Sequence, residues 1–404
     1  MQHSLILQNR SFGYTQRSWG AVFAKGFRPF FLLAALYAVA MVPLWLLIVG
    51  GTVAPRTYLD PVSWHAHEML FGFVAAVLAG FLLTAVGNWT KRETAVGLPL
   101  VLLTLLWLAG RAAMLLGSGW PRGLVAAVDL AFLPALAFAL GRPLLAAKER
   151  RNLVMLAIVG ALFLTNVAVH LDALGVLPPA SARSAVRVGL DLITLVMLII
   201  AGRVFPMFTR NATQASDVRS IPWLDATCVG GMALLTAVDV EAAPSFATAS
   251  LAGAVGVAAA ARAIGWGARR SVRQPLLWIL HVGYGWIVIG LLLRAASGWG
   301  WPHLATLATH ALTVGAIGCL TLGMMARVSL GHTGRMLAAP APLAAVFVAI
   351  NIAALVRVIG PLLVPTRYFE VLVAATAFWS VSFAAFLATY ARALTSPRVD
   401  GRPG

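Results

Sequence analysis

The sequence predicts an all-α polytopic membrane protein with about twelve transmembrane helices. Hydrophobic residues make up 60% of the 404 residues, and only 11% are charged. The apolar residues also gather in runs long enough to cross a bilayer, which takes about 20 residues per helix. A soluble domain has about a quarter of its residues charged, because its surface faces water. The composition therefore argues against a sizeable folded domain outside the membrane.

The expected spans follow one another along the chain, with proline, glycine or a charged residue at most of the breaks. We expect them at residues 30–50, 64–88, 97–117, 122–141, 152–174, 184–205, 222–240, 244–265, 275–295, 302–328, 341–361 and 368–391. They form one membrane domain, 30–391, between a cytoplasmic N-terminal segment, 1–29, and a cytoplasmic C-terminal tail, 392–404. The N-terminus is polar and has no early apolar core, so we expect no cleaved signal peptide.

The basic residues predict the orientation of these spans. When the loops are assigned to alternate sides, 22 of the 30 Lys and Arg residues fall on the side that holds both termini. The positive-inside rule places that side in the cytoplasm. The same scatter over short loops argues against nucleic acid as a partner, in spite of the net charge of +17, because no basic face forms. The expected surroundings are the lipid bilayer.

An internal repeat is suggested by the second, sixth and tenth spans. Their ends read AVGNWTKR at 85–92, GRVFPMFTR at 202–210 and ARVSLGHTGR at 326–335. Aligning Thr90 with Thr333 also places His67 on His310, whereas the sixth span has Val186 at that position. The pattern predicts three pseudo-repeats of four helices each.

Histidines within apolar segments are the main candidates for chemistry. A neutral imidazole in hydrocarbon has two polar nitrogens to satisfy, so it is costly there unless it pairs or binds a metal. Imidazole is a common ligand of haem iron and of copper, and the set therefore predicts metal cofactors, haem first, inside the bilayer. Any one of these histidines can instead be a hydrogen-bonded packing residue. The candidate ligands are His65, His67, His170 and His310 in the outer half of the membrane, and His281 and His332 near its inner side.

Charged residues near these histidines have several possible roles. His65 and His67 point about 200° apart in a regular helix, so they would serve different centres or only one would bind. Glu68 can orient a histidine or carry protons. Asp191 has Arg187 one turn earlier, which favours a self-neutralising pair, with proton transfer as the second interpretation. Two further arginines at inner helix ends, Arg203 and Arg327, can meet haem propionates or lipid phosphate, or only anchor the topology.

Several segments resemble the signature segments of the NnrS family. They are KGFRPFF at 25–31, WHAHEMLFGF at 64–73, GRVFPMFTRN at 202–211, HALTVGAIG at 310–318 and ARVSLGHTGR at 326–335. They occur in the expected order, and the resemblance runs from about residue 20 to 390. It implies a twelve-span protein of the bacterial inner membrane that contains haem b and copper and acts in the response to nitric oxide, in denitrification and under nitrosative stress.

Carried over to this sequence, the resemblance marks candidates within the matching motifs, namely His65, His67, Glu68, His310 and His332. His281 lies in a looser block, LHVGYGW, and His170 matches only by residue type and approximate place. The resemblance assigns no copper ligands here.

The expected function is therefore a membrane haem protein that handles nitric oxide or protects against nitrosative stress. Nitric oxide is a small neutral gas that can arrive through the lipid. Reductive turnover would need electrons from quinol or from a donor protein, and Glu68 and Asp191 are the expected proton carriers. Whether the protein is an enzyme, an oxidoreductase acting on nitric oxide, is left open. The alternatives are a multi-span transporter of metal or haem and a non-enzymatic haem-based sensor.

Overall fold

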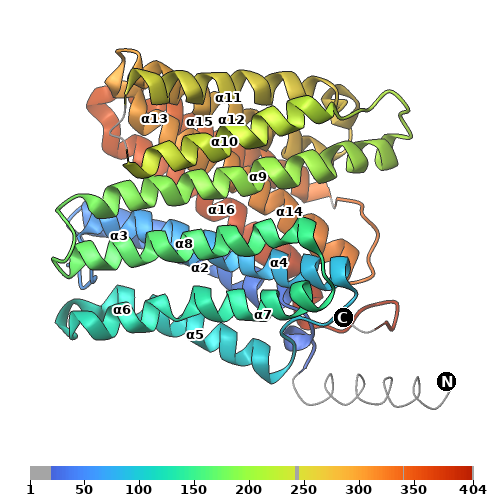
Figure 1. Ribbon diagram of the computed structural model, residues 1–404, viewed down its shortest axis with the longest axis horizontal. Coiled ribbons are helices and arrows are strands. Elements are labelled where there is room, and N and C mark those ends of the chain that lie inside the picture. Colours follow the sequence, from blue (N-terminus) through green and yellow to red (C-terminus); the bar gives the residue numbers. More distant parts are fainter. Residues whose placement is uncertain (1–19, 242–244, 340, 403–404) are drawn as a thin grey trace. The chain divides into compact units, whose positions relative to one another are not determined.

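The computed structural model describes residues 20–241, 245–339 and 341–402, which form helices and no strand (Figure 1). Most of the predicted N-terminal segment, residues 1–19, lies outside the described residues. Within these described residues, twelve helical stretches are long and apolar enough to cross a membrane. This confirms the predicted all-α, twelve-span class.

The helices group into two compact units. The first unit consists of residues 1–182, 325–337 and 386–404, and the second of residues 183–324 and 338–385. The helices of the first unit are α2 (Phe27–Val49), α3 (Pro61–His67), α4 (Ala75–Thr90), α5 (Leu98–Leu116), α6 (Arg122–Leu130), α7 (Phe132–Ala146) and α8 (Leu153–Ala173), with the last parts of α14 (Gly318–His332) and α16 (Tyr368–Thr395). Within this unit α2 packs along α4, α5 along α6, and α7 along α8.

The second unit holds most of α9 (Ser181–Thr213), the first parts of α14 and α16, and five further helices. These are α10 (Pro222–Glu241), α11 (Phe246–Ile264), α12 (Pro275–Gly298), α13 (Ala305–His310) and α15 (Ala341–Leu363). Glycines let α11 and α12 approach closely: a Cβ on Gly253 would lie 3.1 Å from Ala295 Cβ, and one on Gly256 would lie 3.2 Å from Leu291 Cβ. Small residues at such contacts are typical of membrane helices, which gain van der Waals contact when their backbones come close.

The second span begins earlier than the sequence predicts, at Pro61 instead of residue 64. The Asp60 carboxylate accepts hydrogen bonds from the backbone N–H groups of Val62 and Ser63, both at 3.1 Å. This is an N-terminal cap, and Pro61 occupies the first helical position, where its missing N–H costs nothing. The earlier start places His67 in the second turn of the helix.

Two spans change from α to π geometry immediately after a histidine. The π-helix η2 (Glu68–Val74) follows His67, and η7 (Ala311–Ile317) follows His310. The two π segments coincide in the alignment that places His67 on His310. The sixth span, α9, is an α-helix throughout its range. π-Helices are rare and occur frequently at functional sites.

Glycines in these two spans have corresponding neighbours. A Cβ on Gly72 would lie 2.9 Å from Tyr37 Cε1 in α2, and a Cβ on Gly315 would lie 2.6 Å from Trp286 Cγ in α12. About two helical turns further along each span, Gly80 packs on Phe31 of α2 and Gly323 packs on Ile279 of α12. Spans one and two thus pack, within the first unit, as spans nine and ten do within the second. The repeat of three four-helix groups stays a prediction.

Candidate functional site

A buried polar cluster lies inside the first unit, where five helical segments meet. His67 ends α3 and Glu68 begins the π segment, while Arg111 comes from α5 and Asp129 from α6. Asn166 and His170 come from α8, four residues apart and therefore on one face of that helix. The side chains of His67, Glu68 and Asp129 have no exposed surface.

Asp129 is at the centre of the cluster. Its Oδ2 atom lies 2.9 Å from His170 Nε2 and 3.4 Å from His67 Nε2, and it accepts a hydrogen bond of 2.8 Å from Asn166 Nδ2. Its Oδ1 atom accepts a hydrogen bond from Arg111 Nη2. His67, Asp129 and His170 each offer one ligand atom, and the three atoms lie within 4.8 Å of one another.

Glu68 contacts His67 on the side of the ring opposite to Asp129. Its Oε1 atom lies 2.8 Å from His67 Nδ1 and accepts a hydrogen bond of 2.6 Å from Arg111 Nη1. Its Oε2 atom accepts a hydrogen bond from the hydroxyl of Tyr37. The Arg111 guanidinium therefore bridges the two carboxylates, one nitrogen on each.

The hydrogen bonds determine the charge of the cluster. Asn166 donates to Asp129, so its Oδ1 atom is the one that faces His67 Nε2, at 2.9 Å. Both ring nitrogens of His67 then face oxygen acceptors, and a histidine donates at both nitrogens only as the imidazolium. Two carboxylates balance one guanidinium and one imidazolium. A buried charge is tolerated when it is paired and hydrogen-bonded in this way.

His170 retains one nitrogen without a partner. Its Nε2 atom faces Asp129, and its Nδ1 atom is buried with no hydrogen-bond partner among the described residues. The ring of Tyr58 lies 5.5 Å from the ring of His170. Tyr58 belongs to a hydrophobic cluster that keeps water from this end of the site, together with Ile48, Trp64, Ala113, Met114 and Val125.

The donor set fits a single metal ion and does not fit a porphyrin. An ion in place of the His67 Nε2 proton would meet His67 Nε2, Asp129 Oδ2 and His170 Nε2, while Glu68 stays on Nδ1 and fixes the ring, as carboxylates do beside metal-bound histidines. Two imidazoles and a carboxylate suit copper, zinc or iron(II). A haem held between His67 and His170 would need its ring to pass between them. Asp129 Oδ2 lies within 3.4 Å of both imidazoles and occupies that space.

The other predicted histidines lie elsewhere. The ring of His65 stacks on Trp45 with centroids 4.2 Å apart, away from the contacts that His67 makes. In the same unit the ring of His332 lies 5.7 Å from that of Phe27. Of the candidate histidines in this unit, His67 and His170 are the two that the structure brings together, with ring centroids 5.7 Å apart.

Two candidate ligands belong to the second unit. His281 Nε2 lies 3.0 Å from Thr209 Oγ1, and His310 Nδ1 lies 2.7 Å from the carbonyl oxygen of Thr306 in its own helix. Arg327, in the first unit, and Arg203, in the second, are half-buried. Their predicted contacts with propionate or phosphate stay predictions.

The prediction that Asp191 forms an ion pair with Arg187 is wrong. Asp191 pairs with Arg294 of α12 at 2.7 Å, not with Arg187 one turn earlier. The same Arg294 guanidinium also pairs with Asp239 of α10. The Arg294 guanidinium thus lies between two carboxylates that come from two other helices, α9 and α10.

Sequence reasoning missed Arg111, Asp129 and Tyr37 and gave Asn166 no role. A signal for two of them was present, because Arg111 and Asp129 are charges inside predicted spans, and such residues mark functional sites in membrane proteins. Arg111 was used only as one of the basic residues counted to predict the orientation of the spans. The meeting of these residues depends on how α5, α6 and α8 pack, which hydropathy does not report.

Comparison with known proteins places the sequence in a family. The family model described as NnrS protein matches residues 21–398. No curated protein matches the chain. The matched range includes every residue of the buried cluster and nearly the whole chain. The protein therefore belongs to the NnrS family.

Proposed function

We propose that this protein is a membrane metalloprotein for nitric oxide handling or protection against nitrosative stress, in which His67, Asp129 and His170 bind copper. The observation that carries the copper site is the convergence of two imidazole nitrogens and a carboxylate oxygen within 4.8 Å, all buried. Family membership supports the nitric oxide part of the proposal. The proposed location is the bacterial inner membrane, with both termini in the cytoplasm.

The charge of the cluster favours copper in its cuprous form. One monovalent cation that replaces the His67 Nε2 proton leaves the sum of charges unchanged. A divalent ion would leave one uncompensated positive charge in a low-dielectric interior, which is costly. Bound copper would supply a redox-active centre that can coordinate nitric oxide.

The chain's own residues prepare this site. Glu68 orients the His67 ring, and Arg111 holds Asp129 Oδ1 so that Oδ2 faces the histidines. Glu68 and its Tyr37 partner are the nearest groups that can pass a proton, with Asp191 the candidate in the second unit. Electrons for turnover would come from quinol or a donor protein.

Haem b is a separate part of the proposal and requires other ligands. His65, His281, His310 and His332 remain its candidates, with Arg203 and Arg327 for the propionates. The resemblance of the motifs around His65, His310 and His332 supports them.

Metal analysis of purified variants tests the copper site. His170→Ala removes one ligand and leaves the Arg111 ion pairs intact, so it should fold and lose most of the bound copper. Asp129→Asn should lose it as well, whereas Asp172→Asn, on the same helix as His170 and outside the cluster, should keep it. Copper is measured by elemental analysis, and folding by the thermal unfolding midpoint in detergent.

Full copper content in His170→Ala and Asp129→Asn would contradict the ligand assignment. An absorption spectrum that shifts with nitric oxide would support the nitric oxide function. A colourless protein that moves metal or haem across liposome membranes would support a transporter instead.

A further inference from the structure

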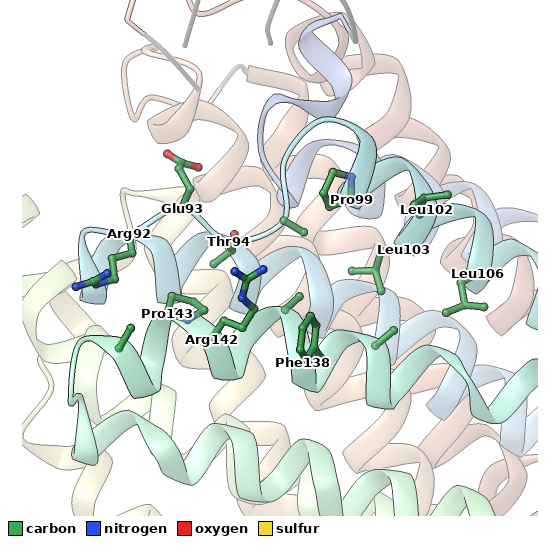
Figure 2. Close-up of a pocket in the computed structure, with 14 residues that line it drawn as sticks. Arg92, Glu93, Thr94, Pro99, Leu102, Leu103, Leu106, Phe138, Arg142 and Pro143 are labelled. Carbon is green, nitrogen blue, oxygen red and sulfur yellow. The ribbon is translucent and has the colours of Figure 1, made fainter. Parts of the chain in front are cut away.

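A large cavity in the first unit plays no part in the proposed function. It has a volume of about 790 Å³ and lies between the loop that follows α4, the first half of α5, and α7 from Ala135 onward. Figure 2 shows Arg92, Glu93 and Arg142 toward one end and the leucines of α5 toward the other. The cavity is therefore polar at one end and apolar at the other.

The polar end has two cationic groups without a counter-ion. The guanidinium groups of Arg92 and Arg142 make no hydrogen bond or ion pair within the described part of the chain, and that of Arg142 lies 5.7 Å from the Phe138 ring centroid. The acid of this end, Glu93, is already occupied: its two oxygens accept hydrogen bonds from Lys25 at 2.8 and 2.9 Å. A ligand that enters here meets two free positive charges and no free negative one.

The apolar end matches a hydrocarbon chain. Leu102, Leu103 and Leu106 of α5 face Ala135 and Phe138 of α7 across it. Leu102 is 57% exposed and Phe138 is 67% exposed. Both helices belong to candidate membrane spans, so these exposed apolar side chains would face lipid, where they are stable. No histidine or cysteine lines the cavity, so it offers no ligand for haem iron.

The geometry points to a binding site for one anionic phospholipid, with its phosphate on Arg92 and Arg142 and an acyl chain between α5 and α7. Basic pockets between membrane helices on the cytoplasmic side recognise anionic headgroups, and this end is on the side predicted to be cytoplasmic. A zwitterionic lipid also brings an ammonium group. Because Glu93 is paired with Lys25, the lining of the cavity offers no free carboxylate to this ammonium group.

Native mass spectrometry of the detergent-solubilised protein tests this site. We expect one phosphatidylglycerol to bind about tenfold or more tightly than phosphatidylcholine, since each basic residue near an anionic headgroup contributes roughly fivefold. Arg92→Gln/Arg142→Gln should remove that preference. Arg269→Gln/Arg273→Gln, a matched pair outside the cavity, should leave it unchanged.

Two further variants separate the two ends of the site. Lys25→Gln frees the Glu93 carboxylate and should weaken phosphatidylglycerol binding, although Lys25 does not line the cavity. Ala135→Trp fills the apolar end and should reduce binding of both lipids. Equal affinity for the two lipids in the unmodified protein, or an unchanged preference in Arg92→Gln/Arg142→Gln, would overturn the proposal. Full displacement of the lipid by millimolar inorganic phosphate would also overturn it, because the site would then bind only the anion.

Discussion

Two arginines in this protein make the same arrangement with different consequences. Arg111 bridges Glu68 and Asp129, and Arg294 bridges Asp191 and Asp239. In the first case the His67 imidazolium supplies a second positive charge in direct contact. In the second case the Oδ2 atom of Asp191 is buried and has no hydrogen-bond partner in the part of the chain that is described. This oxygen is therefore the atom of Asp191 that is free to take up a proton, as its proposed role as a proton carrier requires.

A single methyl group should disturb the proposed copper site. A Cβ on Gly72 would lie 2.9 Å from Tyr37 Cε1, 3.2 Å from Arg111 Nη1 and 3.3 Å from Arg111 Cδ. Gly72→Ala should therefore push Arg111 away from Glu68 and destabilise the protein by about 1–3 kcal/mol, the usual cost of an overpacked core. The thermal unfolding midpoint in detergent measures the change, and elemental analysis measures the copper lost with it.

The matched control is Gly160→Ala on α8, where an added Cβ would meet no atom within 4 Å. Equal unfolding midpoints for the two variants would show that the packing around Gly72 does not hold Arg111 in place.

At the scale of elements, the C-terminal tail is attached to the end of α14 by a few polar contacts. Arg398 Nη1 donates to the carbonyl oxygen of His332 at 3.0 Å, and the N–H of Val399 donates to that of Thr333 at 3.2 Å. Asp400 accepts from Arg398 Nε at 2.9 Å and from Nη2 at 2.6 Å. The hydrogen bonds from Arg398 hold the pKa of Asp400 well below its usual value.

This pKa shift predicts acid release of the tail. A carboxyl whose pKa is depressed by folding contributes stability above its unfolded pKa, and that contribution is lost as the pH falls through the folded value. The tail should therefore stay attached at pH 7 and detach progressively below about pH 4. Hydrogen exchange of the backbone amide of Val399 reports the attachment.

Asp400→Asn should detach the tail at neutral pH by the same reasoning. Asp217→Asn is the control, because Asp217 is another exposed aspartate whose pKa is lowered by an arginine, Arg270, in the second unit. Slow exchange at Val399 in Asp400→Asn, or fast exchange in Asp217→Asn, would show that the Arg398–Asp400 pair does not control the tail.

Element type and span number were predictable from hydropathy, whereas the helix ends and the site were less so. Long apolar runs can only be membrane helices, so twelve spans followed directly. The start of the second span depends on the Asp60 cap, and the π segments have no hydropathy signal. His67 and Glu68 were identified because they lie in a motif. Asp129 was missed because its importance comes from contacts with three other helices, which a pattern along one helix does not contain.

For the whole molecule, the distribution of basic residues predicts that both termini face the cytoplasm. This result needs an even number of spans, and the described part of the chain has twelve candidate spans. A green fluorescent protein fused after residue 404 should therefore fluoresce, and alkaline phosphatase at the same place should stay inactive, because the first becomes fluorescent in the cytoplasm and the second becomes active only outside it.

Fusions after residue 120, in the short segment between the third and fourth spans, provide the opposite case. Phosphatase should be active there and the fluorescent protein dark. The same result at residues 120 and 404 would contradict the alternation of sides on which the orientation rests.

The shared π geometry after His67 and His310 also bears on how the chain arose. A π segment forms when a helix accommodates one residue too many, and losing that residue would restore ordinary α geometry. If spans one and two and spans nine and ten descend from one duplicated ancestor, the insertion predates the duplication, because both copies carry it at the same place. The sixth span has Val186 at the histidine position and is α-helical throughout, so in the described part of this chain the π geometry occurs only in the aligned spans that keep the histidine.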